Sequence, residues 1–319
     1  MKTVELYKNI VLSVITVILV TLLIEGLLIL KNSDMKNYDI EMWKYSKELK
    51  KISSNNTLGH EHKTNKSSVL QGVEISLNNF GMRGEKIDLD KIYDRRILFL
   101  GSSITLGWGV EENKVFSSII QDKFNDENQN VLIMNAGIGN YNSERYTELF
   151  FDKLINTKPT DIFIHYFIND AEYLDQGRNN FILRNSQLAA ILWMTIQKLV
   201  YGGSNQSLTD HYRNVYQDNS LGFKKMKSSL AKLKDFASKN NIRIYLSIIP
   251  DIHNLKDYPF EFIHKKMKNL ASELGIEFID MYPAFSMHNP KSLWAMPGDP
   301  HPNEIGHKLM ANEIYKVIK

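Results

Sequence analysis

The stretch RILFLGSSITLGWG, residues 96–109, decides the fold. It begins as the kind of apolar run that forms a buried strand, passes through a glycine, and continues as the start of a helix. Similar β-rich runs recur further along the chain, at residues 131–134, 161–166, 242–246 and 276–279. Between most of these runs the apolar spacing is that of an amphipathic helix, as at residues 115–124, 143–154 and 223–239.

Apolar strands that alternate with amphipathic helices are typical of a parallel sheet with helices on both faces. We therefore expect residues 67–319 to form a three-layer α/β/α domain around a roughly five-stranded parallel sheet. Residues 181–201 do not fit the alternation and predict a helical insertion between the third and fourth strands. This insertion could cover the site, rest on a membrane or belong to the core.

Toward the amino terminus, residues 10–30 form one long apolar run that includes a single charged residue, Glu25. At about 1.5 Å per residue, a helix of this length can cross a hydrocarbon core about 30 Å thick. No small-residue cleavage site follows, so the run predicts a retained transmembrane signal anchor rather than a cleaved signal peptide. A buried core helix is the alternative, but such a helix should carry a polar stripe. Glu25 lies close enough to the end of the run to reach the interface or a membrane partner protein.

The rest of the amino-terminal region is polar. Residues 1–9 form a short tail, and residues 31–66 read as a juxtamembrane linker, with some helix expected at residues 38–51. His60 and His62 stand in this linker, where solvated side chains are expected rather than a metal site. Lysines precede and follow the apolar run, so charge counting does not set the membrane orientation.

The composition excludes several classes of chemistry. The chain has no cysteine, which rules out disulfides, Cys-ligated zinc and a thiol nucleophile. Its formal net charge of +3 and the lack of a dense Lys/Arg block give no support to nucleic-acid binding. We expect neither a metal ion nor an organic cofactor.

Residues that carry chemistry follow the strands. In an open parallel sheet, ligands bind beyond the carboxyl ends of the strands. Ser103 follows the first strand, the segment NAGIGNYNS at 135–143 follows the second, and Asn169 follows the third. Near the carboxyl terminus, the segment PGDPHPNEIGH at 297–307 contains Asp299 and His301 between prolines. Each signal alone is equally typical of turns and helix caps.

In this order, the four segments resemble the conserved blocks of the SGNH hydrolase superfamily, also called GDSL-like. The segment NFGMRG at 79–84, YPF at 258–260 and IH at 263–264 are similar to membrane-anchored bacterial members. The resemblance covers roughly residues 67–319 and implies a flavodoxin-like fold. It also implies that Ser103 is the nucleophile, His301 the general base and Asp299 the residue that orients His301.

The resemblance further implies an oxyanion hole. Its donors would be the Ser103 backbone N–H, a backbone N–H near Gly139 and Asn140, and the Asn169 side chain. Asn140 stands where the family has a glycine, so the position of that backbone donor is open.

Three other positions depart from the family pattern. Ser102 replaces the aspartate of the first block and leaves two adjacent hydroxyls, of which Ser103 is the expected nucleophile. Phe167 replaces a glycine of the third block and should narrow the site. One residue rather than two separates Asp299 from His301, a spacing similar to that of membrane-associated and polysaccharide-acetylating members. Among the other histidines, His307 in the terminal helix is expected to be structural and His165 within a strand is expected to be packed. No motif surrounds the rest, which are His211, His253, His264 and His288.

These motifs and the apolar run are compatible with three functions. The first is a membrane-anchored serine esterase that hydrolyses small O-acyl esters, most plausibly O-acetyl groups on cell-envelope glycans, through an acyl-Ser103 intermediate. The second is an O-acyltransferase that uses the same triad. The third is a catalytically silent domain that binds a glycan or a membrane partner. The resemblance places the catalytic domain outside the cytoplasm, on a single-pass anchor through residues 10–30.

Overall fold

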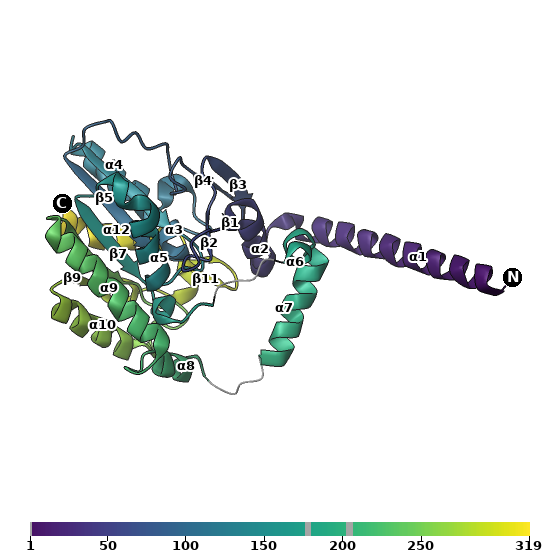
Figure 1. Cartoon of the computed structure of the whole chain (residues 1–319). Helices are drawn as coiled ribbons and strands as arrows, with labels where there is room; N and C mark the ends of the chain where they lie inside the picture. The colour runs from purple at the N-terminus through teal and green to yellow at the C-terminus, as the bar shows by residue number, and fades with distance from the viewer. Residues whose placement is uncertain (1, 176–179, 202–206) are drawn as a thin grey trace. The chain divides into compact units, whose positions relative to one another are not determined.

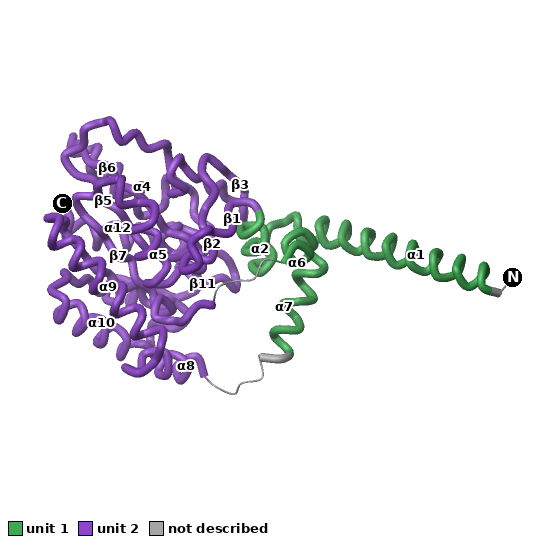
Figure 2. Tube along the Cα trace, in the orientation of Figure 1, with its two compact units in different colours: residues 1–47, 178–205 green, residues 48–177, 206–319 purple. Residues whose placement is uncertain are grey.

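The computed structural model describes residues 2–175, 180–201 and 207–319. These residues form two compact units, coloured separately in Figure 2. Unit 1 consists of Met1–Lys47 and Arg178–Asn205, and unit 2 consists of Glu48–Gly177 and Gln206–Lys319. Each unit is therefore built from two stretches of chain, because residues 178–205 are inserted into unit 2 in sequence but cluster with the amino-terminal helices.

Unit 2 is organised around a five-stranded parallel sheet of strand order β6-β5-β7-β8-β9. The strands are β5 (Arg95–Gly101), β6 (Val131–Gly137), β7 (Asp161–Tyr166), β8 (Arg243–Ile248) and β9 (Glu277–Asp280). All of their pairings are parallel, which confirms the predicted sheet. The chain enters at β5, moves to β6 on one side and then to β7 on the other. The strand order therefore reverses at the carboxyl end of β5, the place where open α/β sheets bind ligands.

Helices cover both faces of this sheet, as Figure 1 shows. Along β5, Ile97 and Phe99 face one core and Leu98 and Leu100 face the other, because side chains of a strand alternate. The first core is closed by helices α4 (Phe116–Asp126) and α12 (Glu304–Ile318). The second core is closed by α5 (Ser143–Leu149), α9 (Leu221–Lys239) and α10 (Glu261–Leu274). The predicted three-layer α/β/α architecture is confirmed.

Short hairpins and helices complete unit 2. The hairpins are β1 (Lys50–Ile52) with β2 (His60–His62), β3 (Lys66–Leu70) with β4 (Val73–Leu77), and β10 (Trp294–Met296) with β11 (Asp299–Pro302). The short helices are α3 (Ser103–Leu106), α8 (Leu208–Val215), α11 (Tyr282–Phe285), η2 (Glu112–Lys114), η3 (Phe150–Leu154), η4 (Ile155–Thr157), η5 (Ile168–Ala171) and η6 (Pro290–Leu293).

Unit 1 consists of helices. They are α1 (Lys2–Lys31), η1 (Asn32–Asp34), α2 (Tyr38–Glu48, whose last residue belongs to unit 2), α6 (Phe181–Asn185) and α7 (Gln187–Tyr201). Within the described residues, one helical span, Thr3–Asp34, is long and apolar enough to cross a membrane, with a mean hydropathy of 2.7. None of that apolar window is buried, so α1 is not the core helix of a soluble domain.

Glu25 of α1 holds the start of α7. Its carboxylate accepts hydrogen bonds from the Ser186 hydroxyl (2.8 Å) and from the backbone N–H groups of Gln187 (2.7 Å) and Leu188 (3.0 Å). These N–H groups have no partner within a helix that starts there, and a carboxylate satisfies them. The Asn32 amide also donates to the Gln187 side chain (3.0 Å). The insertion predicted at residues 181–201 is therefore helical and is hydrogen-bonded to α1.

The boundaries expected in the amino-terminal region differ from the structure. Residues 2–9 are the first turns of α1 rather than a separate tail. Residues 31–66 contain a helix, a hairpin and the start of β3, and unit 2 begins at Glu48 rather than at residue 67. His62 is buried, not solvated, and donates from Nδ1 to the Gly81 carbonyl (2.8 Å). Lys, Asn and Ser dominate this segment. It is ordered by hydrogen bonds from its polar side chains to backbone groups elsewhere in the chain, and the sequence does not reveal these contacts.

Candidate active site

Ser103, His301 and Asp299 form a continuous chain of hydrogen bonds at the carboxyl end of β5. The Ser103 hydroxyl lies 2.8 Å from His301 Nε2. On the other side of the ring, His301 Nδ1 lies 2.6 Å from a carboxylate oxygen of Asp299. The carboxylate can only accept, so Nδ1 carries the proton and Nε2 is free to accept the serine proton. This is the arrangement of a nucleophile, a base and the group that orients the base.

Two glycines allow the nucleophile to stand where it does. β5 ends at Gly101, and α3 begins two residues later at Ser103. A Cβ on Gly101 would lie 2.0 Å from the Thr105 hydroxyl oxygen, and one on Gly137 would lie 2.2 Å from the backbone nitrogen of Leu106. Both distances are far below any real contact, so α3 can pack against β5 and β6 only because neither position has a side chain. Ser103 is thereby held next to the sheet edge.

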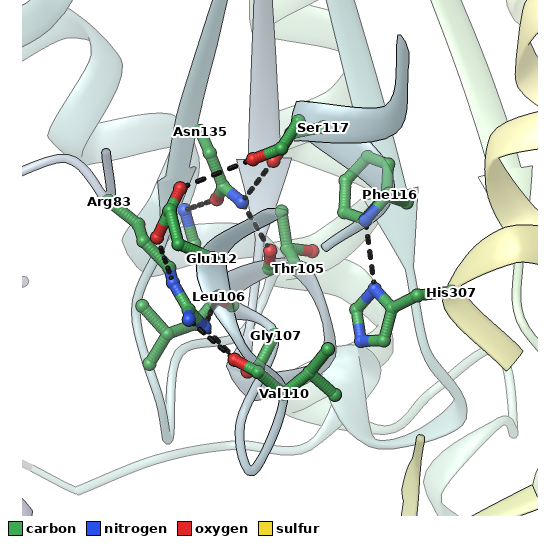
Figure 3. Close-up of polar contacts among 12 residues, drawn as sticks. Arg83, Thr105, Leu106, Gly107, Val110, Glu112, Phe116, Ser117, Asn135 and His307 are labelled. Atoms are coloured by element: carbon green, nitrogen blue, oxygen red, sulfur yellow. Dashed lines mark hydrogen bonds and ion pairs between the residues drawn. The ribbon is translucent and has the colours of Figure 1, made fainter. Parts of the chain in front are cut away.

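A buried polar arrangement supports the loop that follows α3. The Arg83 guanidinium donates to the backbone carbonyls of Leu106 (2.8 Å), Gly107 (2.6 Å) and Val110 (2.6 Å), and pairs with Glu112 (2.7 Å). Figure 3 shows these contacts converging on the one side chain. Arg83 belongs to the segment NFGMRG, and its hydrogen bonds fix the chain just beyond Ser103.

Asn135 and His307 extend this support. The Asn135 amide donates to the Thr105 carbonyl (2.7 Å), and His307 Nδ1 accepts from the Phe116 backbone N–H (3.2 Å), as Figure 3 shows. The Thr105 hydroxyl lies 3.1 Å from His165 Nδ1. His165 and His307 are fully buried, and burial lowers the pKa of His165 to about 3 and that of His307 well below its ordinary value. Both histidines are structural, as expected from the sequence.

The Asp299 carboxylate is anchored by more than His301. It is 1% exposed and also accepts from the His301 backbone N–H (3.1 Å) and the Gln71 side-chain amide (2.7 Å). Burial opposes its ionisation, but the hydrogen bonds from His301 and Gln71 outweigh burial and hold the pKa of this carboxyl below its ordinary value. Asp299 is therefore ionised at neutral pH and accepts a hydrogen bond from His301 Nδ1.

Gln71 is the residue of this site that sequence reasoning missed. It occupies the turn between β3 and β4, where Gln71 (φ 54°) and Gly72 (φ 80°) both adopt the left-handed conformation of a two-residue hairpin turn. The pair Gln-Gly between two short polar-apolar runs could have predicted the turn. Nothing in the sequence could have shown that the turn reaches Asp299, which lies more than two hundred residues further along.

Asn169 lies in the 3₁₀ turn η5, directly after β7. The turn is fixed by Asp170, whose carboxylate accepts from the Phe167 backbone N–H (3.2 Å). The Asn169 side-chain oxygen is buried and makes no hydrogen bond within the described residues, and its amide nitrogen makes none to them either. A side-chain amide that makes no hydrogen bonds to the part of the chain that the structure describes, and that follows the strand paired with β5, is suited to binding substrate.

The third candidate donor lies in the turn after β6. Tyr141 N–H donates to the Ile138 carbonyl (3.2 Å) and closes a four-residue turn, with Asn140 at φ 63°. A positive φ at this position of the turn defines a type II turn, which asparagine tolerates better than most residues. β6 pairs with β5 up to Gly137 and Gly101, so the turn and Ser103 lie at the same sheet edge.

The remaining histidines lie outside this arrangement. His264 is buried between Asp280 (2.7 Å) and the Tyr258 hydroxyl (2.7 Å) and ties the YPF segment to the end of β9. His253 bonds to Asp251, and this contact raises its pKa. The other two are His211, which pairs with Glu172, and His288, whose backbone N–H donates to the Phe285 carbonyl (3.0 Å). Among the described residues, no group of three or more His, Cys, Asp or Glu side chains is placed to hold a metal ion.

A cavity of about 710 Å³ lies away from the triad. Its lining includes Arg83, Glu112 and Asn135 and includes no triad residue. The chemistry is concentrated at the sheet edge, not in this cavity.

Comparisons with known proteins agree with the geometry. A model of the GDSL-like lipase/acylhydrolase family matches residues 99–309, about two thirds of the chain. No curated protein matches. Solved structures that resemble the chain include a psychrotrophic esterase from Pseudoalteromonas sp. (18% identity, 70% of this chain and 97% of that one, TM-score 0.44). Others are an acetyl xylan esterase (17%, 70% and 100%, 0.46) and an acetylxylan esterase from Geobacillus stearothermophilus (17%, 71% and 94%, 0.48).

Proposed function

Because the chain belongs to the GDSL-like lipase/acylhydrolase family and is an ester-hydrolysing enzyme, we propose that it is a membrane-anchored serine esterase with Ser103 as its nucleophile. The observation that carries this proposal is the hydrogen-bond chain from Ser103 through His301 to Asp299. A silent binding domain has no need for a serine hydroxyl 2.8 Å from a histidine that is oriented by a buried carboxylate.

The proposed reaction has two halves. His301 Nε2 takes the Ser103 proton as the oxygen attacks the ester carbonyl, and the same proton then goes to the departing alcohol. This leaves an acyl group on Ser103. Water attacks that acyl group, with His301 again taking the proton and returning it to Ser103 as the acid leaves. Asp299 stabilises the positive charge that His301 carries in both halves.

Three donors are proposed to stabilise the oxyanion of both tetrahedral intermediates. They are the backbone N–H groups of Ser103 and Asn140 and the side-chain amide of Asn169. Each follows one of the adjacent strands β5, β6 and β7, so the three approach the same sheet edge. The loss of one such donor typically costs about 10²–10³ in rate.

A small acyl group, acetyl, is the proposed substrate unit. Phe167 stands at the end of β7 beside Asn169 and is half-buried between the two cores, which leaves less room than the glycine of the resembled block. The alcohol part is proposed to be a cell-envelope glycan, because an anchored enzyme acts on a surface or lipid-linked substrate. No metal ion or organic cofactor takes part in the proposed reaction.

We propose that unit 1 holds the enzyme at the membrane. Helix α1 would cross the bilayer, with unit 2 outside the cytoplasm. Helix α7 exposes Leu192, Trp193, Ile196 and Leu199, and its first turn is held by Glu25 within the apolar span of α1. Apolar side chains at that level of the anchor would meet lipid rather than water, so α7 is proposed to lie against the bilayer.

The test is a mass measurement on the full chain in detergent. A fluorophosphonate probe should add once to the wild type and to Ser102→Ala, and should not add to Ser103→Ala. Ser102 is a matched control, since it is the adjacent hydroxyl and is buried. Hydrolysis of p-nitrophenyl acetate should follow the same pattern and exceed that of longer acyl esters. Labelling that persists in Ser103→Ala, or no labelling of a folded wild type, would overturn the proposal. An acylated sugar formed when an acceptor is added would instead identify an acyltransferase with the same site.

A further inference from the structure

A buried lysine and a histidine both donate hydrogen bonds to the backbone carbonyl of Gly139, which precedes Asn140. Lys50 Nζ donates to the Gly139 carbonyl oxygen at 2.5 Å, and His60 Nε2 donates to the same oxygen at 3.2 Å. The two residues come from the paired strands β1 and β2, far from the turn in sequence. This hairpin belongs to the segment whose composition predicted a linker.

These two hydrogen bonds to the Gly139 carbonyl fix the direction of the Asn140 N–H. The peptide between Gly139 and Asn140 is planar and trans, so its C=O and N–H point in opposite directions. The carbonyl points toward the buried Lys50 ammonium, and the Asn140 N–H therefore points away from it. Within the described residues no group accepts a hydrogen bond from this N–H. Asn140 itself is exposed.

Side-chain hydrogen bonds also hold the other residues of this turn in place. The Tyr141 hydroxyl donates to the His60 carbonyl (2.5 Å), and the Arg145 guanidinium donates to the Asn140 carbonyl (3.2 Å). Asn140 needs this support, because a residue with a side chain at φ 63° is strained where glycine is not. These contacts thus offset the backbone strain that arises because Asn140 stands in place of a glycine. From the sequence alone, the position of this backbone donor was open.

The positive charge of Lys50 also strengthens the Asn140 N–H as a hydrogen-bond donor. A cation on a peptide oxygen draws electron density toward that oxygen and makes the N–H at the other end a stronger donor, as in any polarised chain of hydrogen bonds. Lys50 is 5% exposed, so water screens its charge little. Burial and the nearby Arg145 charge lower the pKa of Lys50 to about 7, which makes its charge sensitive to pH near neutrality.

We propose that Lys50, assisted by His60, is a positioning residue for the oxyanion hole, which aims and polarises the Asn140 N–H through the Gly139 carbonyl. The inference rests on the proposed function, because it concerns a donor of that same site. It gives two residues of the β1–β2 hairpin, Lys50 and His60, a role in positioning the Asn140 N–H.

The experiment compares Lys50→Met with Lys51→Met in the full chain in detergent. Lys51 is the matched control, since it is the adjacent lysine but is exposed and pairs with Glu61. Rates on p-nitrophenyl acetate are normalised to active sites counted with the fluorophosphonate probe. The variant Lys50→Met should lower kcat about 10–100-fold, somewhat less than the loss of a whole oxyanion donor. KM should stay within about threefold, because both halves of the reaction use the same donor. Lys51→Met should match the wild type.

The pH profile is the readout that a merely structural role would not change. The titratable groups near Lys50 include Arg145 from α5 and His60 and His62 from β2, and the Tyr141 hydroxyl bonds to the His60 carbonyl. Burial lowers the pKa of His60 to about 2 and that of His62 to about 3, and it raises the pKa of Tyr141, so these three stay neutral between pH 6 and 9. The wild-type kcat should therefore fall as pH rises through the pKa of Lys50, and Lys50→Met should lack this decline.

Each outcome decides the matter. An active wild type whose kcat and pH profile are shared by Lys50→Met would overturn this inference alone, and so would a change confined to KM. An inactive wild type would overturn the proposed function and this inference with it. If Lys50→Met does not fold, Lys50→Gln, which keeps a neutral donor, takes its place, with an intermediate kcat and no alkaline decline expected.

Discussion

At the scale of single residues, the orientation of His301 depends on a carboxylate that has three donors. Two of them come from His301 itself and one from Gln71. Only the Gln71 contact can be removed without changing a triad residue. It therefore offers a way to measure how much the anchoring of Asp299 contributes to the rate.

The variant Gln71→Asn should lower kcat/KM about tenfold. Asparagine tolerates the left-handed backbone at this turn, but its amide is one methylene too short to reach Asp299. The loss of one hydrogen bond to a charged group is worth about 1.5–3 kcal/mol, and about 1.4 kcal/mol is a tenfold change in rate. Steady-state rates on p-nitrophenyl acetate test this, with exposed Gln129→Asn as the control. Unchanged rates would show that His301 alone orients the carboxylate.

Asp170 predicts a pH dependence of stability. Burial raises the pKa of this carboxyl well above its ordinary value, although the Phe167 N–H and Tyr146 partly oppose the shift. The folded state therefore binds a proton that the unfolded state has already lost. Stability should fall as pH rises from about 4, the ordinary range of an unfolded aspartate, toward the folded-state pKa. Thermal unfolding across this range should show a shallower fall for Asp170→Asn than for the wild type and for the exposed control Asp122→Asn. Parallel slopes would contradict the assignment.

At the scale of elements, the sequence predicted the parallel strands well and the hairpins poorly. Each central strand is an apolar run long enough to be seen, as in ILFL at 97–100, because both of its faces are buried. The hairpins β1–β2 and β10–β11 have strands of three or four residues, and all of these strands except β10 contain lysine, histidine or proline. Their pairing comes from tertiary contacts, which no local pattern records.

The residues of the candidate site also fall into two groups, those that local motifs predict and those that they do not. Ser103, Asn169, Asp299 and His301 stand in short local motifs, so their positions could be predicted from the sequence. Gln71 and Lys50 act through contacts with residues that are 228 and 89 positions away. Nothing near either residue distinguishes it from other polar residues in turns and short strands, so only the folded chain shows what they touch.

Glu25 allows the connection between α1 and α7 to be tested. The variant Glu25→Ala removes the acceptor of the first N–H groups of α7, at a cost of about 1–3 kcal/mol for each group left unsatisfied away from water. In nanodiscs, the amides of Gln187 and Leu188 should then exchange hydrogen at least about tenfold faster, whereas Glu5→Ala should leave them unchanged. Equal protection in both variants would show that α7 does not depend on Glu25. The catalytic rate on a soluble ester should not change, because no triad residue is involved.

At the scale of the whole molecule, the catalytic unit begins at Glu48. Residues 48–66 contribute the fully buried side chains of Leu49 and Leu58 as well as the Lys50 contact. The burial of two leucines is worth on the order of 3–6 kcal/mol. A fragment of residues 67–319 should therefore unfold at a lower temperature and be far less active than a fragment of residues 48–319.

The comparison needs both fragments to carry the same Gly/Ser linker in place of residues 178–205, since neither fragment contains the helix that this segment contacts. Calorimetry gives the unfolding temperatures, and fluorophosphonate labelling counts the active sites. Equal stability and equal labelling would show that unit 2 does not require its first hairpin.

In the proposed membrane-anchored enzyme, the assembly of unit 1 from two distant stretches would affect how the enzyme is released from the membrane. A protease that cut the chain between α1 and α2 would normally shed everything that follows the anchor. Here residues 178–205 would remain part of the cleaved product, and Ser186, Gln187 and Leu188 would still bond to Glu25 of α1. One cut therefore leaves the enzyme bound without a covalent link, and shedding is complete only when those hydrogen bonds also break.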